Sequence, residues 1–309
     1  MKGKRMALET TDLFRQDLSR ASGLHQITSE EVKKIQQVVY SIAKDIAEIC
    51  EENDIPYMLG GGSALGAVRH KGFIPWDDDL DINVYRKDID RLCDLIEEKY
   101  PDKYYVEAPL RTPGYYSSFA QVQLRGTTFR EYLWQEDGKC GIKVDLWLLE
   151  NAYDNPLKRR IQGWLCDGGS LILSCIRMHR EEKGFLHLAA GNKRGQRLIK
   201  IKSALGALPS LSPWWWYRRV QHWYSMCHDD DSKYVTFPSG RKHFFGELYE
   251  RAKYCDTVEM KFEDSYFPVT KDYDHYFHAL YPGDYMELPP EDKRERHVLY
   301  DLKFKEDNP

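Results

Sequence analysis

The strongest constraint on the fold comes from aspartates that lead directly into an apolar segment. Asp79 and Asp81 stand two residues apart and are followed by Ile82 and Val84 in alternation. Residues i and i+2 of a strand share a face, so these two carboxylates would repel each other on one side of a sheet. A divalent cation is their natural partner, and oxygen ligands favour Mg²⁺ or Mn²⁺. Asp77 joins them if the strand begins early, and the alternative is a simple acidic turn.

A glycine-rich turn shortly before these acids supplies groups that bind anions. The sequence predicts a tight turn over residues 60–63, followed by a short helix over 64–70. Backbone N–H groups and a hydroxyl at such a helix start form a phosphate site, here from Gly61, Gly62 and Ser63. Three basic residues then stand between the turn and the acids: Arg69, His70 and Lys71. Anion donors beside paired carboxylates are what phosphoryl chemistry requires.

A further aspartate, Asp145, stands alone in the apolar segment 141–148. A carboxylate between Val144 and Leu146 is costly to bury unless it is paired or bound to metal. We therefore interpret Asp145 as a third metal ligand or as the general base. The alternative is an aspartate that simply emerges into solvent at the end of a strand.

The apolar spacing predicts a mixed α+β chain. One long helix is expected over 29–53, where isoleucines and valines recur every three or four residues after a Thr28/Glu31 capping box. The other expected elements alternate along the chain: strands over 55–59, 80–85, 116–124, 127–134 and 142–149, and a helix over 87–100. The strands 116–124 and 127–134 flank a turn at Arg125-Gly126. This order indicates a mixed sheet flanked by helices.

The charge is unevenly distributed along the chain. The whole sequence of 309 residues has a net charge of −4, which disfavours a dedicated nucleic-acid binder. Between Lys158 and His222, however, 13 Lys or Arg stand against 3 acids. This segment also contains three consecutive tryptophans, residues 214–216. We interpret it either as a helical insert with a solvated basic face or as a peripheral contact with an anionic membrane or a charged glycan.

These observations divide the chain into three parts. We expect a catalytic core over 1–150, a basic helical insert over 151–235, and a C-terminal segment over 236–309 that packs back on the core. No two of the seven cysteines form a C-x-x-C pair, and no signal peptide or membrane-spanning stretch is visible. The sequence therefore predicts a cytoplasmic protein, with peripheral contact at the inner face of the membrane as an alternative for the basic segment.

The run from Tyr57 to Ile82 resembles the signature of the LicD family, which is related to fukutin and fukutin-related proteins. It retains the Gly-Gly-Ser stretch, Gly-Ala-Val-Arg-His, Gly-Phe-Ile-Pro-Trp and the aspartates, with Ala64 in place of a leucine. The tail resembles the family as well, at Phe262-Glu263-Asp264, Phe267-Pro268-Val269, Tyr273-Asp274, Tyr276, Gly283-Asp284-Tyr285-Met286, Leu288-Pro289-Pro290, Lys293-Arg294 and His297. It departs from the pattern at Thr270 and Pro282, which affects details of donor or acceptor binding.

The resemblance implies a nucleotidyltransferase fold of the DNA polymerase β type. It implies transfer of a phosphorylated small alcohol, such as phosphocholine or a polyol phosphate, from a CDP-linked donor to a sugar hydroxyl of a lipopolysaccharide, capsule or teichoic acid. CMP would leave. The residues expected to act are Asp77, Asp79, Asp81 and Asp145 for Mg²⁺ or Mn²⁺ and catalysis, and Gly61, Gly62, Ser63, Arg69, His70 and Lys71 for the donor.

Two tail residues, Arg294 and His297, are expected either to fold back on the donor or to form a surface salt bridge. Two other functions remain open at this point: an ordinary nucleotidyltransferase that releases pyrophosphate, and a catalytically silent glycan- or membrane-binding protein. The pair His275 and His278 has the spacing of metal ligands, but no third ligand accompanies it.

Overall fold

A computed structural model describes residues 25, 27–131, 139–208, 212–291, 294, 297 and 299–305. The helices are α1 (Ser29–Glu52), α2 (Gly61–His70), α3 (Ile89–Lys99), α4 (Pro156–Arg180), α5 (Glu182–Leu188), α6 (Lys193–Gly206), α7 (Pro213–Tyr224), α8 (His243–Gly246), α9 (Arg251–Tyr254) and α10 (Tyr273–Leu280). The strands are β1 (Tyr57–Leu59), β2 (Asp81–Tyr85), β3 (Tyr104–Glu107), β4 (Ala120–Leu124), β5 (Thr128–Glu131), β6 (Lys143–Ala152), β7 (Tyr234–Thr236), β8 (Leu248–Glu250), β9 (Thr257–Phe262), β10 (Ser265–Thr270) and β11 (Leu299–Lys303). The expected mixed α+β architecture is confirmed.

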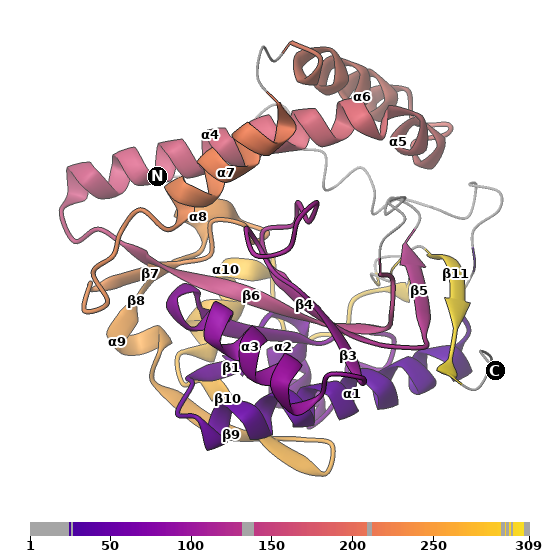
Figure 1. The fold of residues 1–309 in the computed structure, drawn as a ribbon, viewed down its shortest axis with the longest axis vertical. Coiled ribbons are helices and arrows are strands. Elements are labelled where there is room, and N and C mark those ends of the chain that lie inside the picture. The colour runs from indigo at the N-terminus through magenta and orange to yellow at the C-terminus, as the bar shows by residue number, and fades with distance from the viewer. Residues whose placement is uncertain are drawn as a thin grey trace.

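A seven-stranded sheet organises the molecule. Five strands lie in the order β1-β2-β6-β4-β3, and β7 and β8 extend the sheet from the far end of β6. Only the pair β2 and β6 runs parallel, while the other pairs of this sheet are antiparallel. Figure 1 shows β6 as the long central strand, with α1 below the sheet and the helices α4–α7 above it.

The long helix α1 confirms the prediction from apolar periodicity. Thr28 and Glu31 form the expected capping box, with each side chain bonded to the other residue's backbone N–H. Residues at helical spacing are fully buried on one face, among them Ile35, Ile42 and Ile46. Most of the buried core is one cluster that includes this face and the alternating apolar residues of the central strands, such as Ile82, Val122 and Leu146. Two smaller clusters lie under α4–α7.

The two strands predicted on either side of Arg125-Gly126 are present, but they do not pair with each other. The first of these strands, β4, pairs with β3 and β6, whereas the second, β5, pairs with β11 from the C-terminal tail. Both edges of β4 are already occupied, so β5 cannot join it. Instead, the Thr127 hydroxyl donates to the Leu124 carbonyl and accepts from the Ile142 N–H, which leads the chain out of the main sheet.

Two other local expectations also need correction. Residues 60–63 do not form a separate turn before the helix, because Gly60 is the N-cap and Gly61 already begins α2. The strand expected over 116–124 is shorter and begins at Ala120 as β4, while the tail holds the short helix α10, the antiparallel pair β9–β10 and the strand β11. None of the helices among the described residues is long and apolar enough to cross a bilayer.

We predict that Gly66→Ala destabilises the protein. A Cβ at Gly66 would lie 2.5 Å from the Gly72 carbonyl oxygen. This is a backbone atom, so relieving the clash would require the chain itself to shift. The expected loss in the free energy of unfolding is about 1–3 kcal/mol. Gly168→Ala on α4 is the matched control, since a Cβ there meets nothing within 4 Å and should stabilise the helix slightly. Urea denaturation of both variants measures the effect, and equal stabilities would contradict it.

Candidate active site

The parallel pairing of β2 and β6 brings two of the predicted aspartates side by side. Asp81 is the direct register partner of Asp145, and adjacent strands lie about 4.8 Å apart. Asp79 and Asp77 precede Asp81 in the chain segment that enters β2. These three residues line a cavity of about 750 Å³, while Asp145, beside Asp81 on the next strand, does not line it.

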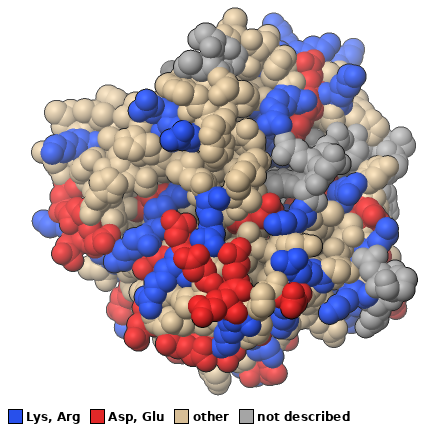
Figure 2. Space-filling view, viewed as in Figure 1, with Lys and Arg blue, Asp and Glu red and all other residues tan. Residues whose placement is uncertain are grey.

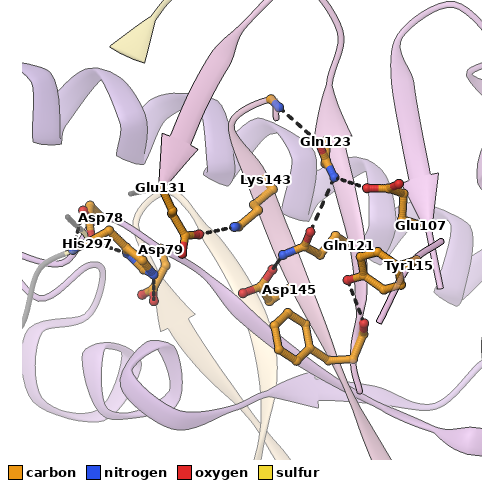
Figure 3. Close-up of polar contacts among 12 residues, drawn as sticks. Asp78, Asp79, Glu107, Tyr115, Gln121, Gln123, Glu131, Lys143, Asp145 and His297 are labelled. Carbon is orange, nitrogen blue, oxygen red and sulfur yellow. Dashed lines mark hydrogen bonds and ion pairs between the residues drawn. The ribbon is translucent and has the colours of Figure 1, made fainter. Parts of the chain in front are cut away.

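Hydrogen bonds hold the two paired aspartates in place. The Asp81 N–H donates to the Ser63 hydroxyl at 2.9 Å, and the Trp147 indole N–H donates to Asp81 Oδ1 at 2.8 Å. The Gln121 side-chain amide donates to Asp145 Oδ1 at 2.9 Å (Figure 3). Each carboxylate therefore keeps a second oxygen for another partner.

The buried negative charge of these carboxylates favours a bound cation. Burial raises the pKa of Asp79 to about 6, and the pKa values of Asp77 and Asp81 are raised well above the ordinary value by burial and then by neighbouring carboxylates. The pKa of Asp145 is also raised, chiefly by burial. Like charges that are buried together are stabilised by a hard cation with oxygen ligands.

The donor chemistry therefore fits Mg²⁺ or Mn²⁺, although the side chains are not yet closed around an ion. In the part of the chain that the structure describes, no three His, Cys, Asp or Glu side chains stand close enough to form a finished metal site. His275 and His278, the other predicted pair, are bonded to aspartates of their own helix region and are exposed.

His297 returns from the C-terminal tail to this cluster. Its Nδ1 lies 2.9 Å from Asp78 Oδ1, its backbone N–H donates to the other oxygen of Asp78 at 3.2 Å, and its Nε2 lies 4.0 Å from Asp79 (Figure 3). Burial alone would lower the pKa of His297, but Asp78 and other nearby carboxylates raise it well above the usual value. A protonated His297 thus neutralises part of the acidic charge.

The predicted basic residues separate into two groups. Arg69 and Arg294 line the cavity, whereas His70 and Lys71 do not. Arg69 donates to the carbonyls of Tyr285 and Glu287, and Arg294 lies over the Trp76 ring at 4.2 Å from its centre. Lys71 is exposed at the C-cap of α2, and His70 is bonded to Arg69.

The predicted phosphate-binding residues lie directly against the acids. A Cβ at Gly61 would be 2.9 Å from Asp81 Oδ2, and one at Gly62 would be 2.8 Å from Asp77 Oδ2, so only glycine allows this approach. The Gly61 N–H donates to the Tyr276 hydroxyl. The Ser63 side chain is buried and accepts from Asp81, as described above. In this arrangement, the start of α2 positions Asp81.

Several residues of the site were missed from the sequence. Trp147 is two residues beyond Asp145 on the same strand face, so the period of the strand could have identified it. Lys143 precedes Asp145 by the same step and is paired with Glu131 (Figure 3). Burial alone would raise the pKa of Glu131, but Lys143 lowers it to about 2. Tyr276 belongs to the tail that resembles the family, but no local spacing places it at the site, because α10 reaches Gly61 only through the tertiary fold.

The chain is similar in sequence to several known proteins. Residues 54–159 match the profile of the LicD/FKTN/FKRP nucleotidyltransferase domain. The chain carries a LicD-family domain. Over 277 residues it is 24% identical to the lipopolysaccharide cholinephosphotransferase LicD of Haemophilus influenzae, a match that covers 87% of this chain and 96% of that protein. Over 47 residues it is 43% identical to the human ribitol 5-phosphate transferase FKRP, covering 15% of this chain and 10% of that protein.

The LicD-family domain ends at residue 159, but its cavity is completed by later residues. One of them is Glu247, which is 4% exposed and lines the same cavity as the aspartates. It accepts a hydrogen bond from the Lys242 N–H at 2.7 Å. Burial raises the pKa of Glu247 to about 7.

We predict that Glu247→Gln changes how stability depends on pH. Between about pH 4.5 and 7 the folded protein keeps a proton on Glu247 that the unfolded chain releases, so stability falls as pH rises through this window. The fall is at most about 3 kcal/mol. Glutamine carries no charge, so the free energy of unfolding of the variant, relative to that of the native protein, should increase from pH 5 to pH 8. Urea denaturation across this range tests it, with the exposed Glu98→Gln as control. Parallel pH curves for native protein and Glu247→Gln would contradict the assignment.

Proposed function

We propose that this protein transfers a phosphorylated small alcohol, such as phosphocholine or a polyol phosphate, from a CDP-linked donor to a sugar hydroxyl of a cell-surface glycan, with Mg²⁺ or Mn²⁺ as cofactor. The observation that carries the proposal is the pairing of Asp81 with Asp145 beside a cavity that Asp77 and Asp79 also line. The named activities of its relatives, a cholinephosphotransferase and a ribitol 5-phosphate transferase, support the choice of transferred group.

The proposed reaction is a displacement at phosphorus. The acceptor hydroxyl oxygen forms a bond to the phosphorus that bears the small alcohol, and the bond from that phosphorus to the CMP oxygen breaks. CMP takes the electron pair and leaves. Asp145 does not itself line the cavity, so in this proposal it acts from beside Asp81, where it completes the cation site or receives the proton of the attacking hydroxyl.

The other residues bind and orient the donor. Asp79 and Asp81 would hold the cation, with Asp77 beside them. When bound, the cation stabilises the negative charge that develops on the phosphoryl oxygens. Arg69 and Arg294 line the same cavity and would neutralise the diphosphate. The nucleotidyltransferase fold of the polymerase β type and the cytoplasmic location are part of this proposal.

The products of turnover test the proposal. The protein is incubated with CDP-choline, CDP-ribitol, CDP-glycerol or CTP, together with lipopolysaccharide, capsular polysaccharide or teichoic acid. Release of CMP with phosphorylation of the glycan is expected. Pyrophosphate from CTP would instead identify an ordinary nucleotidyltransferase. No turnover of any donor, with retained glycan binding, would identify a silent binding protein.

A further inference from the structure

The outer face of α6 is apolar although nothing among the described residues covers it. The helix packs on the C-terminal half of α4 through its buried face, where Lys202 bonds to Ser174 at 2.9 Å and Ser203 contacts His179 at 3.4 Å. At helical spacing, the opposite face carries Ile201 and Leu205, and Leu208 follows just beyond the end of the helix. Their exposed fractions are 40%, 45% and 76%.

The N-terminal half of α4 has a second apolar stripe. Leu157, Ile161 and Trp164 recur at steps of four and three residues, and their exposed fractions are 65%, 44% and 65%. The opposite face of this half is buried through Gly163 and Cys166, so the stripe points away from the core.

The two stripes lie on the same side of α4. His179, which contacts α6, is 18 residues beyond Ile161, and 18 residues make five whole turns of a helix. Figure 1 shows α6 lying along α4 on the side away from the sheet. We call the six residues Leu157, Ile161, Trp164, Ile201, Leu205 and Leu208, with the lysines and arginines beside them, the α4–α6 surface.

Basic side chains surround these apolar residues. On α6, Lys193, Arg197 and Lys200 line an open hollow of about 460 Å³ together with Ile201. On α4, Lys158 and Arg160 flank Leu157 and are exposed. No ion pair joins these five basic residues to a carboxylate of the described chain. Figure 2 shows that most acidic side chains of this view gather in the lower half of the molecule, away from the helices α4–α7.

We propose that the α4–α6 surface binds an anionic phospholipid bilayer, with its apolar residues in the headgroup boundary and its basic residues on the lipid phosphates. Amphipathic helices with Trp or Leu beside Lys and Arg lie in this way at an interface. Each Lys or Arg near an anionic membrane adds about fivefold to the affinity.

Other occupants fit the surface less well. A second copy of this chain would bring an equally basic face and be repelled. Residues 1–24 contain five Lys or Arg and three acids, so this segment is also basic overall. A soluble polyanion would satisfy the charges but give no reason for exposing six large apolar side chains. Only a partner with both anionic groups and an apolar interior matches all the residues.

The test is co-sedimentation of the full chain with vesicles of phosphatidylcholine alone or mixed with phosphatidylglycerol, at low and at high salt. We expect binding to the anionic vesicles that weakens as salt rises. Arg197→Gln combined with Lys200→Gln should weaken binding about 25-fold. Trp164→Ala combined with Leu208→Ala should weaken it about tenfold.

The matched control is Lys261→Gln combined with Tyr266→Ala on the β9–β10 pair, which removes one exposed charge and one exposed aromatic far from α4 (Figure 1). It should bind as the native protein does. Equal binding of all variants, or no binding to anionic vesicles at low salt, would overturn the proposal. The proposal would also be overturned if the protein bound dextran sulfate as strongly as anionic vesicles and Trp164→Ala left that binding unchanged. A dimer that Trp164→Ala dissociates would overturn it as well. None of these readouts needs catalytic turnover, so they are independent of the proposed reaction.

Discussion

Asp81→Asn and Asp145→Asn should each abolish transfer while leaving the protein folded. Each asparagine keeps the oxygen that accepts the present hydrogen bond, from Trp147 in one case and from Gln121 in the other. What is lost is the charge. Removing one electrostatic element of this kind, or the general base, lowers the rate by about 10²–10⁴-fold.

The same variants should be more stable than the native protein when no metal is present. Burial and neighbouring carboxylates raise the pKa of Asp81, which means that its charge destabilises the metal-free fold. Neutralising it should add about 0.5–2 kcal/mol to the free energy of unfolding. CMP release and urea denaturation are measured on the same samples, with the exposed Asp102→Asn as control. Lower activity accompanied by lower stability would indicate a structural role instead.

Removing divalent cations should produce the second large effect. EDTA is expected to stop CMP release, and Mg²⁺ or Mn²⁺ should restore it. A cation that binds only the folded state at 100 times its Kd adds about 2.7 kcal/mol of stability, so the Tm should rise by a few degrees. Because ligands must lose their protons, the rise should grow as pH increases through about 6, the pKa of Asp79.

A matched variant shows whether the cation sits where we propose. Mg²⁺ should not raise the Tm of Asp81→Asn, whereas it should raise that of Asp102→Asn as it does for the native protein. Thermal unfolding by circular dichroism, with and without EDTA, makes this comparison. An equal rise in Asp81→Asn would place the cation elsewhere, and full activity in EDTA would exclude a catalytic metal.

The elements that sequence reasoning predicted well are those with long or unambiguous local patterns. The helix α1 repeats its apolar spacing over six turns, and β2 alternates directly after the aspartates. The strands on either side of Arg125-Gly126 were identified, but their partners could not be, because those partners lie elsewhere in the chain. The strands β7 and β8 have only three residues each and are too short for a periodic signal.

The candidate site, like the fold, could be predicted from the sequence only in part. The acids were identifiable because buried like charges are costly and demand a partner. Their placement was not, because the pairing of Asp81 with Asp145 depends on the parallel register of β2 and β6. The role of Ser63 also depended on structure: its spacing suggests a phosphate ligand, but its hydroxyl holds the Asp81 backbone.

The kinds of group at the candidate site could be predicted from the sequence: carboxylates suited to a hard cation, glycines that allow a close approach, and a basic segment separated from an acidic remainder. These predictions follow from residue type and local spacing, both of which can be read directly from the sequence. Only the tertiary structure decided which groups meet. It brought His297 to Asp78 across 219 residues, aligned Asp81 with Asp145, and set the apolar stripes of α4 and α6 on one side. Such contacts depend on long-range packing, which no local pattern encodes.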